Sequence, residues 1–64
     1  MANKMYDWIM ARLDEGRTVY ATNYLRSVKI APKHRAMVRL RGNHVEVQRG
    51  KHWDSIIGCK ITAI

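Results

Sequence analysis

The pattern of hydrophobic and polar residues divides the chain into one helical segment followed by segments with the alternation typical of β-strands. Between residues 2 and 15, apolar side chains recur at steps of three and four residues, which places them on one side of a helix. They are Ala2, Met5, Tyr6, Ile9, Met10 and Leu13. Asn3 suits the N-cap position, and Gly16 suits the C-terminal stop. We therefore predict one amphipathic helix over residues 2–15.

The clearest β signal is a hairpin over residues 36–48, centred on Gly42-Asn43, a pair that is typical of two-residue turns. Closing the chain there pairs Arg41 with His44 and Val38 with Val47. In this register apolar and polar side chains separate completely, and a slip of one residue would destroy the separation. The inner face carries Ala36, Val38, Leu40, Val45 and Val47, and the outer face carries Arg39, Arg41, His44 and Glu46.

Residues 18–30 are rich in β-branched and aromatic side chains, which favours a strand. As one continuous strand, however, this segment would have two faces of mixed polarity. A helix from about Thr22 to Lys29 is the alternative, and it would convert the fold into a winged helix-turn-helix. We predict the strand, which ends where Pro32 disfavours helical geometry at Ala31.

A second turn at Arg49-Gly50-Lys51 leads to a final strand over residues 53–64. A three-residue loop would pair Val47 with Trp53 and direct Trp53, Ile57 and Cys59 toward the helix. Gly58 would then mark a bulge or bend. The predicted fold is α+β, with one N-terminal helix packed on a three- to four-stranded antiparallel sheet. It forms a single small basic domain over residues 1–64, the size of one folding unit.

Charge adds the first functional indication, because 12 Lys and Arg face only 5 Asp and Glu, giving a net charge of +7. Residues 1–15 carry two basic and three acidic side chains, a balance of −1, whereas residues 16–64 carry ten and two, a balance of +8. Like charges repel and cost stability. We therefore expect a polyanionic partner, either nucleic acid (DNA or RNA) or an acidic protein surface.

An antiparallel sheet can leave one face in water, and the basic residues would occupy that face. Arg39 and Arg41 would be the central contacts, because Arg binds phosphate in a bidentate manner and a two-stranded ribbon fits a major groove. The alternative is that the basic face binds no partner and only keeps the protein soluble. The candidate nucleic-acid-binding residues are Arg26, Lys29, Lys33, Arg35, Arg39, Arg41, Arg49, Lys51 and Lys60.

The aromatic residues allow two interpretations. Exposed tyrosines beside cations could stack with single-stranded bases, but we expect Tyr20 and Tyr24 at the core margin with their hydroxyls in water. In the predicted register Trp53 is a core residue. Trp8 flanks the apolar stripe of the helix and would be a half-exposed anchor for a partner.

Candidate catalytic and metal-binding residues are few. The spacing of His34, His44, His52 and Cys59 matches no short zinc motif. Cys59 fits a small buried hydrophobic residue better than a nucleophile, and the four glycines are too scattered for a phosphate-binding loop. We expect no metal, no cofactor and no enzymatic activity.

Location is also constrained by what the chain contains. It has one cysteine, no apolar run of about 18 residues and no secretory signal pattern at its start. We therefore expect a soluble cytoplasmic protein that does not bind membranes. The last residues, 61–64, would form an unpaired strand edge through which a homodimer could form.

The stretch Val47–Asp54, VQRGKHWD, is loosely similar to small accessory proteins encoded by bacteriophages. This resemblance covers eight residues and assigns no site. It implies an alternative function, in which the same basic face binds and inhibits a host protein or nucleoprotein complex.

Overall fold

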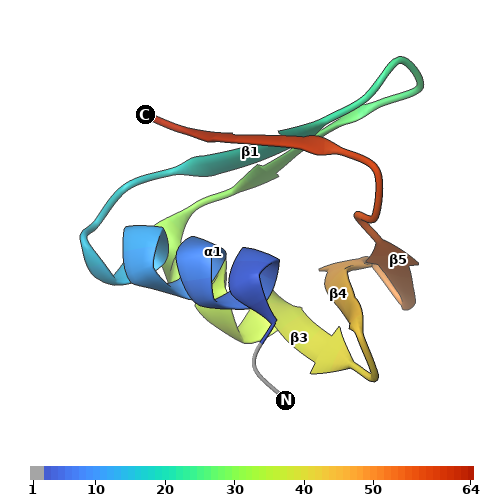
Figure 1. Cartoon of the computed structure of the whole chain (residues 1–64), viewed down its shortest axis with the longest axis horizontal. Coiled ribbons are helices and arrows are strands. Elements are labelled where there is room, and N and C mark those ends of the chain that lie inside the picture. Colours follow the sequence, from blue (N-terminus) through green and yellow to red (C-terminus); the bar gives the residue numbers. More distant parts are fainter. Residues whose placement is uncertain (1–2) are drawn as a thin grey trace.

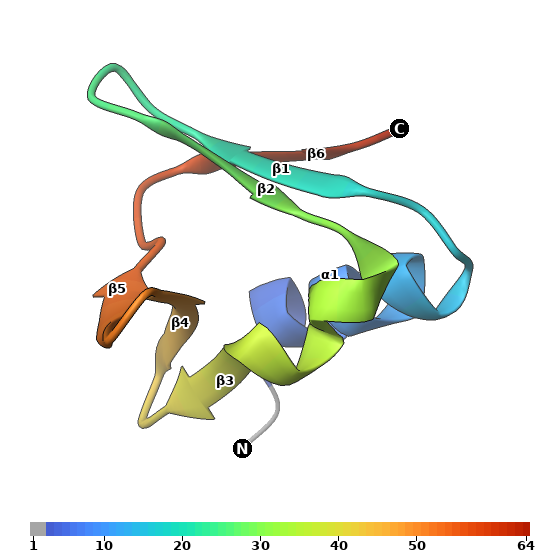
Figure 2. The ribbon, with the colours of Figure 1, turned by 180° about the vertical axis from the view of Figure 1, so that it is seen from behind.

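A computed structural model describes residues 3–64 and confirms the α+β class. The elements, in chain order, are α1 (Lys4–Asp14), β1 (Val19–Thr22), β2 (Ser27–Ile30), the 3-10 helix η1 (Pro32–Met37), β3 (Val38–Arg41), β4 (His44–Arg49), β5 (His52–Ser55) and β6 (Lys60–Ala63). The strands form two three-stranded antiparallel sheets, ordered β2–β1–β6 and β3–β4–β5. The β2–β1–β6 sheet lies across the top of Figure 1, and α1 and the second sheet both lie beneath it. The reverse view in Figure 2 shows the same arrangement.

Helix α1 forms where the apolar periodicity predicted it, and Ile9, Met10 and Leu13 are its buried residues. Asn3 caps its start, because the side-chain oxygen accepts a hydrogen bond of 3.0 Å from the Tyr6 backbone N–H. At its end the Gly16 N–H donates to the Leu13 carbonyl and the Arg17 N–H to the Arg12 carbonyl. These two bonds form a Schellman motif, which satisfies carbonyls that the helix leaves free. The predicted apolar residue Ala2 lies outside the described residues.

The β character of residues 18–30 is confirmed, but the segment forms a hairpin instead of one strand. Val19 pairs with Ile30 and Thr22 with Ser27. The chain reverses at Asn23, whose side-chain oxygen accepts from the backbone N–H groups of Leu25 (2.8 Å) and Arg26 (3.0 Å). An asparagine that satisfies two N–H groups in this way stabilises a turn locally. The alternative helix, and with it the winged helix-turn-helix, does not form.

The central hairpin has the predicted register, from Val38 opposite Val47 to Arg41 opposite His44. Strand β3 begins only at Val38, so Ala36 lies exposed in η1 and not on the inner face. Gly42 has φ +60°, and so does Gly50, which opens the next turn. A glycine with positive φ in the first central position is typical of the two-residue type II′ turn.

The three-residue loop predicted at Arg49–Lys51 was wrong, because Gly50-Lys51 forms a two-residue turn. Arg49 therefore pairs with His52, and Gln48 pairs with Trp53. The shift of one residue moves Trp53 from the inner face to the outer face of the sheet, so it is not a core residue.

Residues 53–64 do not form one strand either. After β5 the chain bends through residues 56–59 and enters the other sheet, where Lys60 of β6 pairs with Thr22 of β1. Ile56 is fully buried at this bend, whereas Ile57, which was expected to face the helix, is 65% exposed. The predicted bend at Gly58 and the predicted burial of Cys59 are confirmed. Strand β6 pairs with β1 along one edge and is the outermost strand of its sheet, so the open strand edge predicted for the last residues is present.

The core lies between the two sheets and α1. It is formed by Ile9, Met10, Leu13, Val19, Ala21, Val28, Ile30, Val38, Val45, Val47, Ile56 and Cys59. All side chains in this cluster are apolar or a thiol, and no charged side chain of the described residues is buried. The charged side chains of residues 3–64 are therefore at the surface or at the margin of the core. Within residues 3–64 no helix has the length and apolar character needed to cross a membrane.

Candidate nucleic-acid interface

The arginines and the lysines of this protein have different surroundings. Ion pairs within 4.0 Å engage six arginines with four of the five carboxylates, and they involve Arg12, Arg17, Arg26, Arg35, Arg39 and Arg49. No lysine of the described residues takes part in such a pair. Ion pairing therefore reduces the charge that most arginines can offer to a polyanion, and it leaves the ammonium groups available.

Arg39, the predicted central contact, is held within its own sheet. Its Nε and Nη2 atoms both lie 2.8 Å from Oε1 of Glu46, the residue opposite it on β4. Its guanidinium also lies over the ring of Trp53, 4.0 Å from the centroid, which is cation–π geometry. Since this arginine is neutralised on one side and stacked on another, its role is to join β3, β4 and β5.

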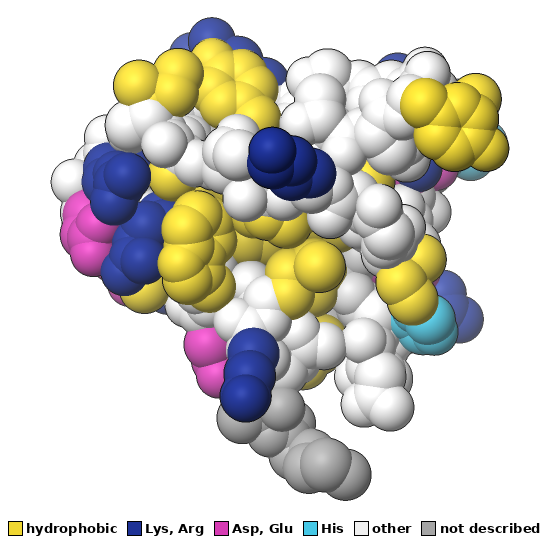
Figure 3. All heavy atoms as spheres, turned by 45° about the horizontal axis from the view of Figure 1, so that its top comes forward, with side chains coloured by type: hydrophobic (Ala, Val, Ile, Leu, Met, Phe, Trp, Pro, Cys, Tyr) yellow, Lys and Arg dark blue, Asp and Glu magenta, His cyan; other side chains and the backbone are white. Residues whose placement is uncertain are grey.

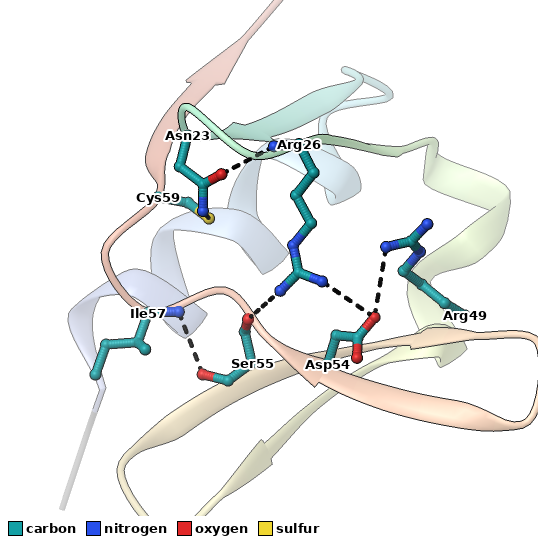
Figure 4. A network of polar contacts seen from close by, with 7 residues as sticks. All are labelled: Asn23, Arg26, Arg49, Asp54, Ser55, Ile57 and Cys59. Atoms are coloured by element: carbon teal, nitrogen blue, oxygen red, sulfur yellow. Dashed lines mark hydrogen bonds and ion pairs between the residues drawn. The ribbon is translucent and has the colours of Figure 1, made fainter.

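Arg26 and Arg49 converge on one carboxylate, as Figure 4 shows. Asp54 Oδ2 lies 3.4 Å from Arg26 Nη1 and 3.6 Å from Arg49 Nη1. Arg26 also donates a hydrogen bond of 3.1 Å to the Ser55 carbonyl. Nearby, the Asn23 amide donates to the Cys59 sulfur at 3.4 Å. These contacts fasten the β1–β2 turn to the chain leaving β5, so Arg26 is a structural link between the two sheets.

The remaining candidate residues differ in their partners. Arg35 pairs with Asp14 at 2.6 Å and ties η1 to the end of α1. The other five have no ion pair among the described residues, and they are Lys29, Lys33, Arg41, Lys51 and Lys60. All five are exposed.

Two of these lysines share the outward face of the β2–β1–β6 sheet, which we call the outer sheet face. Inward side chains of these strands belong to the core or pack against it, so the alternate residues point outward. The outer sheet face consists of Tyr20, Thr22, Ser27, Lys29, Lys60 and Thr62. None of these is acidic, and no described element covers this face (Figures 1 and 2).

The register fixes the arrangement on this face. Tyr20 lies on the central strand, directly between Lys29 on β2 and Thr62 on β6. Thr22 lies one step further along, between Ser27 and Lys60. Directly opposed residues have Cβ atoms about 4.5–5.5 Å apart. Tyr20 therefore has Lys29 directly beside it on β2 and Lys60 diagonally across from it on β6. Three hydroxyl groups lie on the same face, those of Thr22, Ser27 and Thr62.

The single strand predicted over residues 18–30 does not produce this grouping. The sequence does contain a sign of the turn, because the apolar positions change from odd to even numbers within this segment. Val19 and Ala21 are apolar at odd positions, and Val28 and Ile30 are apolar at even positions. A turn that shifts the phase between them puts all four on one face, and it gathers Tyr20, Thr22, Ser27 and Lys29 on the other.

Of the two tyrosines, only Tyr24 contradicts the expected position. Tyr24 was placed at the core margin, but it is 95% exposed at the tip of the β1–β2 turn, beside an exposed Leu25. Tyr20 is half-buried and lies on the outer sheet face. Trp8 is 38% exposed, as the half-exposed position predicted for it requires, and the Arg12 guanidinium lies 5.1 Å from its ring centroid.

On the face shown in Figure 3, the basic residues do not form one continuous patch. In Figure 3, where the top of Figure 1 is brought forward, Lys and Arg side chains stand in separate groups with hydrophobic side chains between them. The group at the left edge lies against acidic side chains. The expectation of a single basic side opposite an apolar side is therefore corrected on this face. Which residues lie together on each surface matters more for binding than the total charge of the chain.

Within residues 3–64, no three His, Cys, Asp or Glu side chains are grouped so that they could hold a metal ion. Comparisons with protein-family models, with curated proteins and with solved structures give no match.

Proposed function

We propose that this protein binds nucleic acid through the outer sheet face, with Lys29 and Lys60 as the phosphate contacts and Tyr20 as a stacking platform. The observation that carries the proposal is the composition of this face. It holds two ammonium groups without ion-pair partners, one aromatic ring and three hydroxyls, and it holds no carboxylate.

The geometry favours a single strand over a duplex. Proteins that bind single strands combine cations that follow the backbone with aromatic side chains on which bases stack. A sheet face with its ring on the central strand allows a base to lie flat on Tyr20 while the flanking phosphates approach Lys29 and Lys60. The hydroxyls of Thr22, Ser27 and Thr62 would add hydrogen bonds to phosphate or sugar oxygens.

The proposal assigns the predicted basic residues unequal roles. Lys29 and Lys60 are the central contacts, in place of Arg39 and Arg41. Arg26 and Arg39 keep the fold together through their ion pairs and contribute little to binding. A proposal based on total charge would give Arg26 and Arg39 the same weight as the lysines. The unequal roles therefore distinguish the present proposal from that one.

The test is the salt dependence of binding to a fluorescent oligothymidylate, measured by anisotropy. Each phosphate contact with single-stranded nucleic acid contributes about 0.7 to the slope of log affinity against log salt concentration. The double variant Lys29→Gln, Lys60→Gln should therefore make this slope less steep by about 1.4. Lys33→Gln, Lys51→Gln removes the same charge from other surfaces and is the matched control.

A second comparison separates stacking from charge. Tyr20→Ala should weaken binding by about 1–3 kcal/mol, the usual range for one stacked base, whereas Tyr20→Phe should retain it. Equal slopes for the two double lysine variants, or wild-type affinity of Tyr20→Ala, would contradict the proposal.

A second candidate function, binding to a partner protein, is favoured by the turn at residues 23–26. Tyr24 and Leu25 are 95% and 75% exposed, although the turn itself is fixed by three hydrogen bonds from and to Asn23. Rigid exposed aromatic residues are typical anchors of interfaces. After nuclease treatment, a purified binding partner should be retained by the wild-type protein and lost by Tyr24→Ser, Leu25→Ser, and retention by that variant would argue against this function.

A further inference from the structure

A second surface feature lies between the two sheets, on a different side of β2 from the outer sheet face. It is a cavity of about 270 Å³, which we call the inter-sheet slot. Its lining residues come from β2, η1 and the end of β4, and they are Ser27, Val28, Lys29, Ile30, His34, Met37, Val47, Gln48 and Arg49.

One wall of the inter-sheet slot is the backbone edge of β2. All four residues of this strand, Ser27–Ile30, line the cavity. Successive side chains of a strand point to opposite faces, so a cavity that touches four in a row must run along the edge. Strand β2 is the outermost strand of its sheet, and its outward N–H and C=O groups therefore have no sheet partner.

The opposite wall is a second strand edge. Three successive residues of β4, Val47–Arg49, line the cavity. Strand β3 pairs with β4 only as far as Val47. The residues before β3 turn away in η1, so Gln48 and Arg49 are paired with β5 alone. The slot is thus bounded by two strand edges, one from each sheet.

The charge around the inter-sheet slot is of one sign. Lys29 and Arg49 are the charged lining residues and both are positive, and none of the nine lining residues is acidic. Arg49 is half-exposed and only 3.6 Å from Asp54, a carboxylate that it shares with Arg26. The Ala31 N–H donates to His34 Nδ1 at 3.4 Å, which leaves Nε2 as the donor of the neutral ring. Val28, Ile30, Met37 and Val47 supply the apolar part of the lining.

We propose that the inter-sheet slot receives an extended acidic peptide segment of a partner protein as an added strand. Its backbone would pair with β2 on one side and with Gln48 on the other, because Arg49 directs its own backbone groups toward His52. This is strand addition to open sheet edges. Its carboxylates would meet Lys29 and Arg49 at the rim, and its alternate apolar side chains would enter the slot. A nucleic acid lacks the regular alternation of N–H and C=O groups that two strand edges recognise. The inference does not depend on the proposed nucleic-acid function.

The probe is the peptide acetyl-Glu-Val-Glu-Val-Glu-amide, titrated into the ¹⁵N-labelled full chain and followed by NMR. Shifts should concentrate on residues 27–30 and 47–49, and the amides facing the slot should gain protection from hydrogen exchange. Arg49→Gln should weaken binding about two- to fivefold, the effect of one exposed ion pair. Lys51→Gln, which neutralises an exposed lysine two residues away, should leave the affinity unchanged.

Three controls make the result decisive. The same peptide N-methylated at both valines should bind more weakly, because it loses the N–H donors on one of its two strand edges. The peptide acetyl-Lys-Val-Lys-Val-Lys-amide should bind more weakly, because its charge matches that of the rim. Lys60→Gln should leave peptide binding unchanged while it weakens oligothymidylate binding, so failure of either proposal can be seen separately.

The inference is overturned if residues 27–30 and 47–49 do not shift at millimolar peptide, or if the N-methylated or basic peptide binds equally well. It is also overturned if oligothymidylate shifts residues 47–49 as strongly as the peptide does, because the slot would then be part of a nucleic-acid site. Shifts at Ser27 and Lys29 do not distinguish the two sites, because both residues also belong to the outer sheet face.

Discussion

Replacing Arg26 by alanine is the sharpest test of how the two sheets are held together. The Arg26 guanidinium donates to the Ser55 carbonyl at 3.1 Å and pairs with Asp54 at 3.4 Å. Both partners belong to β5, whereas Arg26 leads into β2 in the other sheet. The Arg26→Ala variant removes both contacts and leaves the Ser55 carbonyl without this donor.

The expected loss follows from the surroundings of this side chain. A hydrogen bond that involves a charged group contributes about 1.5–3 kcal/mol, and an exposed ion pair about 0.2–1 kcal/mol. The Arg26 and Asp54 side chains are 34% and 31% exposed, so solvent screening places both contributions toward the lower end. We expect a loss of about 2 kcal/mol, which lowers Tm by roughly 8–16 °C in a domain of this size.

The assay is urea unfolding followed by tryptophan fluorescence, with Arg41→Ala as the matched control. Arg41 is exposed and has no ion pair among the described residues, so its loss should cost no more than about 0.5 kcal/mol. Asp54→Asn should cost less than Arg26→Ala, because the bond to Ser55 remains. If Arg26→Ala is as stable as Arg41→Ala, Arg26 is not a link between the sheets.

Three further predictions concern local structure. Gly50→Ala should lower the unfolding free energy by about 1–2 kcal/mol, because alanine is strained at φ +60° and nothing within 4 Å would compensate; an unchanged urea midpoint would refute the type II′ turn. Asn3→Ala should cost about 1 kcal/mol, since Asn3 caps α1 and its amide donates to the Asn43 carbonyl at 2.9 Å, and hydrogen exchange of the Tyr6 amide should accelerate if the cap is real. The pKa of Glu15 should lie below its ordinary value, because Arg12 donates a hydrogen bond to the carboxylate at 2.9 Å and Arg17 another at 3.3 Å. The stability contributed by this carboxylate is complete above its unfolded pKa and is lost as pH falls through the lowered one; in an NMR titration Arg12→Gln should raise the Glu15 pKa, and an unmoved pKa would exclude Arg12 as the cause.

Elements governed by local pattern were predictable from the sequence. The helix follows from apolar residues at three- and four-residue steps, and the central hairpin follows from Gly42-Asn43 between alternating runs. The adjacent turn was misjudged although Gly50-Lys51 has the same Gly-X form as Gly42-Asn43. That one-residue error was sufficient to place Trp53 in the core. In the structure Trp53 lies on the solvent side of the β3–β4–β5 sheet, against Arg39.

The two-sheet arrangement was harder to predict because it depends on phase changes within apparently continuous strands. The turn at Asn23 and the bend at residues 56–59 each shift which positions face inward. Ion pairing is harder still, since Arg26 and Asp54 are 28 positions apart and meet only when the sheets are assembled. Net charge indicates an excess of cations over carboxylates, but it cannot show which cations the protein's own carboxylates engage.

The most direct test of the proposed function is to map oligothymidylate binding on the ¹⁵N-labelled protein by NMR at low salt. We predict that the shifts concentrate on the outer sheet face, at Tyr20, Thr22, Ser27, Lys29, Lys60 and Thr62, and that they diminish in Lys29→Gln, Lys60→Gln. Shifts confined to the β3–β4 hairpin around Arg39 and Arg41, or no shifts at millimolar oligonucleotide, would contradict it.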